Sequence, residues 1–159
     1  MTKLRTLFGA TLIAAAFSST AFASSPDVYV VKFRADTDAS SQTLDSQLAS
    51  AIAMAGANVE EVTIDTSTAA RWEKSAHEAF DRDIVPVFNK WVGLPGFAAV
   101  VDAKSKRVLG CVNANIDAGT MAREIGKMSA KAAGKAYMSN ASTRAVTECP
   151  PAFNVDPGL

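Results

Sequence analysis

Two cysteines, Cys111 and Cys149, carry the most reactive side chains of the chain. Two thiols can form a structural disulfide, or one or both of them can act as nucleophiles. An even number of cysteines in a small exported domain most often indicates a disulfide, and the N-terminal residues discussed below predict export. A nucleophilic thiol needs a lowered pKa, which a helix N-terminus supplies, but Cys111 falls inside a predicted strand. We therefore predict a Cys111–Cys149 disulfide and keep a thiol-dependent enzyme as the alternative.

Two carboxylates, Asp36 and Asp38, stand between a predicted strand and a predicted helix. They are close enough in sequence to share a cation, because carboxylate oxygens are common cation ligands. In a turn before a helix, however, such side chains more often accept hydrogen bonds from the free backbone N–H groups. We interpret Asp38, or its neighbour Ser40, as the N-cap of the helix that follows.

His77 is the only histidine, and it lies among charged residues on the polar side of a predicted helix. This position is more typical of a surface residue than of a base or a metal ligand. One histidine and two distant cysteines give no zinc-ligand spacing. The chain also lacks a nucleophile-elbow pattern, a phosphate-binding loop and a dinucleotide fingerprint. We therefore expect no metal and no cofactor.

Residues 1–23 have the pattern of a secretory signal peptide. Lys3 and Arg5 form a short positive region, an apolar run follows at Leu7–Phe17, and Ala21–Ala23 has the small-x-small pattern of a cleavage site. No later stretch approaches the roughly 20 consecutive apolar residues of a membrane helix. We therefore expect export to a bacterial periplasm and no membrane insertion after the signal is removed.

The charge balance of the mature chain argues against nucleic acid as a partner. Two of the 16 basic residues and none of the 16 acidic residues precede residue 24, which leaves a net charge of 14 − 16 = −2. A nearly neutral chain offers no electrostatic attraction to nucleic acid or to an anionic membrane surface.

Four stretches have the composition of β-strands. Residues 28–33 form a short apolar run, which is typical of a strand buried on both faces. Residues 59–65 place two apolar side chains two positions apart and predict a second strand. Residues 97–102 and 107–112 flank a polar connection of hairpin length, which predicts an antiparallel pair.

Apolar residues at helical spacing predict three helices and one short helical segment. The first helix is expected to end at Gly56, because a left-handed residue commonly follows a helix C-terminus. Pro86 is expected to separate the second helix from the short segment. We expect the apolar positions of each helix to pack in the core, with Trp72 and Trp91 buried or half-buried. The positions are Leu44, Leu48, Ala51, Ile52 and Ala55, then Trp72, Ala76 and Phe80, then Val87, Phe88 and Trp91, and finally Met121, Ile125, Met128 and Ala132.

The order of these elements is strand, helix, strand, helix, strand, strand, helix. A strand–helix–strand unit implies a parallel pair with a right-handed crossover, and the hairpin adds antiparallel strands. We predict one α/β domain over residues 24–133, with a mixed four-stranded sheet and helices on both faces. Residues 134–159 are predicted to form an irregular C-terminal tail that Cys149 holds to the domain.

At two places the residues resemble the thioredoxin family. Val31–Asp36 is similar to the strand and turn that precede the redox motif of that family, and Leu94–Phe97 looks like its cis-proline turn. Gly110 or the region Val112–Ala114 is similar to the family's bulged return strand. The resemblance covers about residues 28–132 and implies a thioredoxin-like fold. It also implies a cis peptide bond before Pro95, which the sequence itself leaves open.

The chain departs from the family at the redox motif. The Cys-x-x-Cys sequence would fall on Asp38–Ser41, so that Asp38 and Ser41 stand at the two cysteine positions. Thiol–disulfide exchange needs a thiolate of low pKa and a resolving thiol, and a carboxylate and a hydroxyl cannot replace them. We therefore predict a redox-inactive protein with this fold.

The resemblance also implies a peptide-binding groove between two loops. In redox-active members an extended peptide lies against the proline loop, which is a form of strand addition. We hypothesise an exported binding or assembly module of the cell envelope with a protein or peptide partner. The alternatives are a periplasmic thiol-disulfide oxidoreductase or thiol-dependent enzyme that uses Cys111, Cys149 or both, and a purely structural protein. The predicted groove residues are Asp36, Asp38, Ser41, Leu94, Pro95 and Gly96.

Overall fold

The structure is a computed structural model that describes residues 25–137 and 148–152. The predicted signal peptide, residues 1–23, lies outside the described residues, as does most of the predicted tail. No helix in the described part of the chain is long and apolar enough to cross a membrane.

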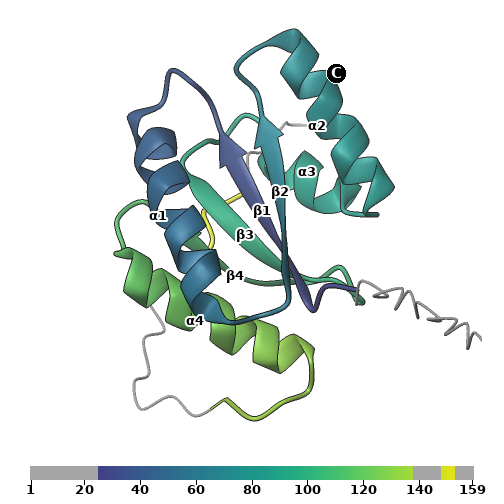
Figure 1. The fold of residues 1–159 in the computed structure, drawn as a ribbon. Helices are drawn as coiled ribbons and strands as arrows, with labels where there is room; N and C mark the ends of the chain where they lie inside the picture. Colours follow the sequence, from purple (N-terminus) through teal and green to yellow (C-terminus); the bar gives the residue numbers. More distant parts are fainter. Residues whose placement is uncertain (1–24, 138–147, 153–159) are drawn as a thin grey trace, which may run out of the picture.

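The described residues form an α/β domain with one mixed sheet, as the sequence predicts (Figure 1). The sheet has four strands in the order β2-β1-β3-β4. Strands β1 and β2 are parallel, and β3 is antiparallel to both β1 and β4. The strands are β1 (Val28–Arg34), β2 (Val59–Asp65), β3 (Phe97–Asp102) and β4 (Val108–Asn113). The helices are α1 (Ala39–Ala55), α2 (Ala69–Asp81), α3 (Val85–Trp91) and α4 (Ala118–Ala132).

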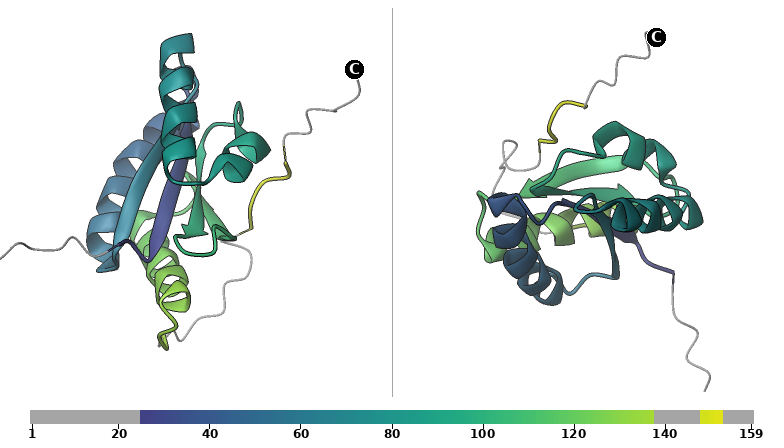
Figure 2. Two further views of the ribbon diagram at one scale, coloured as in Figure 1. Left: turned by 90° about the vertical axis from the view of Figure 1, so that its right-hand side faces the viewer. Right: turned by 90° about the horizontal axis from the view of Figure 1, so that it is seen from above.

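Helices cover both faces of the sheet, and each face has its own apolar core. Figure 2 shows α1 and α4 on one face and α3 on the other. Strand β1 contributes to both cores because alternate side chains point to opposite faces. Val28 and Val30 pack toward α1 and α4, whereas Val31 and Phe33 pack toward α2 and α3. This arrangement is consistent with a thioredoxin-like fold.

Side-chain caps begin three of the helices, and the cap of α1 is Asp38, one of the two residues that the sequence predicts. Asp38, Thr68 and Asp117 each accept a backbone N–H from the third residue beyond. Such caps satisfy a backbone donor that has no partner within the helix. Gly56 follows α1 in the left-handed conformation, with φ at +57°, as predicted. Pro86 lies in the first turn of α3, where its missing N–H costs nothing.

The sequence prediction for the buried side of α2 is wrong. Phe80, which we expected in the core, is 74% exposed, and Trp72, which we expected to be buried or half-buried, is 46% exposed. The buried residues of this helix are Ser75 and Ala79, one position before the predicted positions Ala76 and Phe80. Small residues let α2 lie close to the sheet, and the hydroxyl of Ser75 accepts the backbone N–H of Asp65 at 2.8 Å. Of the three apolar residues at spacing four, Trp72 and Phe80 are therefore exposed, and Ala76 is partly buried against the core.

The β3–β4 hairpin contains an irregularity of the kind that the sequence predicts. Val100 pairs with Gly110, but the next residue, Val101, pairs with Val108, so that Leu109 is the extra residue. Such a bulge bends one strand and re-aims its side chains. The bulge directly precedes Gly110 and Cys111, and Cys111 anchors the tail through its disulfide with Cys149.

Candidate functional site: a proline loop beside a disulfide-held tail

Three loops meet at the carboxyl end of β1. The turn after β1 contacts the start of α2, because Asp36 Oδ2 lies 2.6 Å from Nη1 of Arg71. The same turn is tied to the β2–α2 loop, since the backbone N–H of Asp36 donates to Ser67 Oγ at 2.8 Å. The proline loop completes the group, as the backbone N–H of Gly96 donates to the carbonyl of Phe33 at 2.9 Å. The predicted groove residues therefore do lie on adjoining loops.

Asp38 and Ser41, which the resemblance sets at two cysteine positions, bind each other. Asp38 Oδ2 accepts the backbone N–H of Ser41 at 2.7 Å and its hydroxyl at 2.8 Å. Ser41 Oγ also accepts the backbone N–H of Ala35 at 3.2 Å, and the Ser41 side chain is fully buried. The pair thus joins the turn to the first turn of α1. Its hydrogen-bonding capacity is largely used in holding the backbone.

Gly96 brings the proline loop against this pair. Its φ is +92°, which L-residues rarely adopt. A Cβ at this position would lie 2.9 Å from Cβ of Ser40 and 3.2 Å from Oδ2 of Asp38. Glycine is therefore required here both by the backbone conformation and by the close approach.

Pro95 differs from the cis-proline that the resemblance implies. The described residues contain no cis peptide bond, so the Leu94–Pro95 bond is trans. Leu94 and Pro95 are half-buried, and Leu94 packs against the core on the α2–α3 side. The loop keeps its predicted place between α3 and β3, but its backbone departs from the family's pattern.

A chain of ion pairs runs beside the loops and was not predicted from the sequence. The guanidinium of Arg34 contacts carboxylates from three segments: Asp36 at 2.8 Å, Asp45 at 3.2 Å, and Asp65. Arg71 also contacts Asp65, at 3.3 Å. Arg34 ends β1 and its side chain is largely buried. The network therefore links β1, α1, β2 and α2 at one edge of the sheet.

The ion pairs change the titration of two carboxyl groups. The hydrogen bond from Arg34, together with one from Arg71, lowers the pKa of Asp36. Burial opposes ionisation of Asp65, but hydrogen bonds from Ser67 and Arg34 outweigh it and lower the pKa of that carboxyl as well. Both carboxylates are ionised near neutral pH, and Asp36 has arginine partners rather than a shared cation with Asp38.

The proline loop also lines an open apolar pocket of about 430 Å³. Leu94 and Pro95 form one wall of the pocket. Phe97, the first residue of β3, also lines it. The pocket also contains Asn113 and Asn115, which follow β4, and three residues of the tail. Its lining residues are Leu94, Pro95, Phe97, Asn113, Asn115, Glu148, Cys149 and Pro150.

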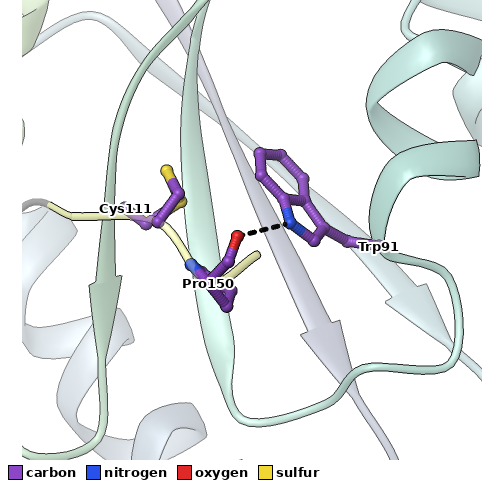
Figure 3. Close-up of a disulfide and its surroundings, with 4 residues drawn as sticks. Trp91, Cys111 and Pro150 are labelled. Atoms are coloured by element: carbon purple, nitrogen blue, oxygen red, sulfur yellow. Dashed lines mark hydrogen bonds between the residues drawn. A yellow bond between two sulfur atoms is a disulfide. The ribbon is translucent and has the colours of Figure 1, made fainter. Parts of the chain in front are cut away.

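The predicted disulfide is present and holds the tail at this pocket. Cys111 of β4 and Cys149 are bonded across 38 residues, with their Cα atoms 4.8 Å apart. Figure 3 shows the adjacent residue Pro150 beside Trp91, whose indole N–H donates to the Pro150 carbonyl at 3.1 Å. Trp91 is fully buried, so this bond satisfies a polar group that would otherwise be costly to bury. Residues 148–152 of the tail are thus held by a covalent bond and by a hydrogen bond.

The disulfide bears directly on the thiol alternative. Neither cysteine is free among the described residues, and Cys111 is only 2% exposed. Thiol chemistry at this pair would first require reduction of the bond. The disulfide itself is typical of an oxidising, exported location.

The six predicted groove residues fall into two groups of three with different roles. Leu94 and Pro95 do line a pocket, and Gly96 sets the close contact behind them. Asp36, Asp38 and Ser41 instead hold the turn through ion pairs and capping bonds. The tail residues Glu148 and Pro150 were missed. Only the disulfide could have indicated them, because Cys149 was predicted to join β4.

His77 is exposed on α2, as predicted. The described residues contain no cluster of three or more histidine, cysteine or acidic side chains that could hold a metal ion.

Comparison of the chain with protein-family models, curated proteins and solved structures found no match. Arguments about function therefore rest on the fold and the site alone.

Proposed function

We propose that this protein is an exported, redox-inactive binding or assembly module of the cell envelope, built on a thioredoxin-like fold. One observation carries the proposal. Asp38 and Ser41 occupy the positions of the redox motif and act as a buried capping pair, while the neighbouring proline loop lines an open apolar pocket.

The pocket suggests the chemistry of the partner. Leu94, Pro95 and Cys149 give it a largely apolar lining, and Asn113, Asn115 and Glu148 add polar groups. Apolar walls with a few polar groups are typical of sites that take one anchoring side chain and orient the adjoining backbone. We expect an extended peptide or loop that places an apolar side chain in the pocket. The periplasm is the proposed compartment, supported by the signal-like residues 1–23 and by the disulfide.

Selection of displayed random peptides on the oxidised mature protein tests this proposal. We expect enriched peptides to share an apolar residue and to bind in solution by calorimetry. Leu94→Asp places a charge in the apolar pocket and should weaken binding about tenfold or more. Met54→Asp is a matched control, because Met54 is 57% exposed on α1, on the opposite face of the sheet. Equal loss in both variants, or no enrichment, would count against the pocket.

A redox assay distinguishes the proposed binding module from the main alternative, a thiol-disulfide oxidoreductase. The oxidised protein should not accelerate reduction of insulin by dithiothreitol, because the described cysteines are paired and Cys111 is buried. Activity that Cys149→Ser abolishes would favour the thiol-disulfide oxidoreductase instead.

A further inference from the structure

Helix α2 carries apolar side chains that the domain uses only in part for its own core. Trp72, Ala76 and Phe80 recur at intervals of four and so lie in a stripe along one side of the helix. Ala76 is partly buried against the core, whereas the two aromatic residues remain exposed to solvent. Trp72 packs edge-on against Phe88 of α3, with ring centroids 5.8 Å apart, yet it remains 46% exposed. Phe80 is 74% exposed. Exposed aromatic residues gathered on one surface are typical of an interaction site.

The charged residues of α2 leave this stripe clear. Arg71 is bound to Asp36 and Asp65, and Arg82 is bound to Glu60 and Glu78. These pairs lie on the side of the helix that faces β2, where they line a separate polar pocket. Helix α2 itself lies at the outer side of the molecule (Figure 1). The stripe is therefore open to a partner without the loss of any ion pair described here.

The order of side-chain sizes along the stripe is symmetric. Two large aromatic residues flank a small one, with Ala76 at the centre. If a second copy of α2 lies antiparallel across this centre, Trp72 of one copy meets Phe80 of the other at both ends. The two Ala76 residues then face each other and let the helices approach closely. A two-fold axis generates this pairing, which is the commonest symmetry of protein dimers.

Charges beside the stripe favour the same orientation. Glu73 and His77 are exposed and lie along the same flank of α2. In the antiparallel pairing, Glu73 of one copy lies next to His77 of the other, and the contact occurs twice. A parallel pairing would instead place Glu73 beside Glu73, which is unfavourable.

We propose that α2 is a self-association surface, through which two copies of this chain pair antiparallel along Trp72, Ala76 and Phe80. A buried aromatic side chain contributes on the order of 150–250 Å². Two partly exposed aromatics in each copy cover only part of the roughly 1,200–2,000 Å² of a standard interface. The dimer is therefore weak and depends on protein concentration.

Sedimentation equilibrium over about a hundredfold range of protein concentration tests the proposal. The oxidised mature protein should shift from monomer to dimer. Phe80→Ser should raise the dissociation constant about tenfold or more, since it removes the aromatic contact at both ends of the interface. Met54→Ser, at an exposed site on α1, should leave it unchanged. A monomer throughout, or a dimer that Phe80→Ser does not weaken, overturns the proposal.

A charge exchange tests the orientation. His77→Glu sets a second carboxylate opposite Glu73 of the other copy, so this variant should associate more weakly than the natural protein. Mixing it with the Glu73→Lys variant should give a heterodimer, because one cross-contact then joins the introduced lysine to the introduced glutamate and the other keeps the natural contact of Glu73 with His77. If the mixture associates no better than His77→Glu alone, the antiparallel arrangement is wrong. Leu94→Asp should not affect the dimer, which keeps this test separate from peptide binding.

Discussion

At the residue scale, Asp38 and Ser41 form a structural pair at the start of α1. Asp38 is one acceptor for two donors of Ser41, and Ser41 in turn accepts from Ala35. A thiol pair at these positions could make neither the short carboxylate bonds nor the strong cap, because sulfur is a weak hydrogen-bonding group. The same positions that would support exchange chemistry therefore fix the junction between β1 and α1.

Gly96 shows how closely the proline loop is held to that junction. We predict that Gly96→Ala lowers the free energy of unfolding by about 2–3 kcal/mol, because it adds both backbone strain and contact with Ser40 and Asp38. Urea denaturation followed by circular dichroism measures the loss.

Gly93→Ala is the matched control for Gly96→Ala. Gly93 has nearly the same φ, +91°, but a Cβ there would meet nothing within 4 Å. It should therefore cost only the backbone strain, about 1 kcal/mol. Equal losses for the two variants would show that the contact with the turn is unimportant.

At the scale of elements, the sequence predicts what local patterns determine. The caps Asp38 and Asp117, the C-terminal Gly56 and the break at Pro86 each act through nearby backbone groups, so they can be identified before the fold is known. The buried side of α2 could not be identified in this way. The sequence shows the same apolar period of four whether α2 packs on the sheet through Trp72 or through Ser75 and Ala79. Which side is buried depends on how close the helix lies to β2.

The ion-pair network could not be predicted from the sequence either, because its members come from four separate elements.

The ion-pair network predicts a definite response of the folded protein to acid. Asp36 and Asp65 have a lowered pKa in the folded protein, against an ordinary value of 3.8. A group whose pKa is lowered on folding contributes stability above its unfolded pKa and loses it as the pH falls through the folded value. The free energy of unfolding should therefore fall steadily below about pH 4.

Arg34→Met should flatten that acid dependence, since it removes the guanidinium shared by both carboxylates. Denaturation midpoints at a series of pH values from neutral to acidic measure the slope. Arg123→Met is the control, because Arg123 is bound only to the Thr120 hydroxyl among the contacts described here. A residual slope is expected in both variants, as Asp102 and Asp117 also have a lowered pKa. Identical slopes in Arg34→Met and the natural protein would contradict the role of the network.

At the scale of the whole molecule, the strand order and the two cores follow from the succession of elements. Long-range contacts made by irregular backbone do not follow from the succession of elements. The pairing of Cys111 with Cys149 could be predicted, since only two cysteines exist. The contact of Pro150 with Trp91 could not, because a carbonyl in an irregular segment carries no pattern. The pocket at the proline loop has the same limit, because three of its eight lining residues belong to the tail.

The tail should contribute to the stability of the domain mainly through its disulfide. We predict that reduction, or the double variant Cys111→Ser/Cys149→Ser, lowers the free energy of unfolding by about 2–4 kcal/mol. The bond closes a loop of 38 residues, and closing such a loop restricts the unfolded chain. Denaturation with and without reductant measures the change, and reductant should have no effect on the double variant.

Fluorescence can show whether the tail also leaves Trp91. In a Trp72→Phe background, Trp91 is the only indole, because the chain has two tryptophans. Its N–H bonds to Pro150, next to the disulfide, so opening the bond should expose the ring to water. We expect the emission of the folded, reduced protein to shift to longer wavelength and iodide quenching to increase. If reduction lowers stability without changing Trp91 emission, the disulfide stabilises the chain but the tail stays in place, held by the indole and the pocket wall.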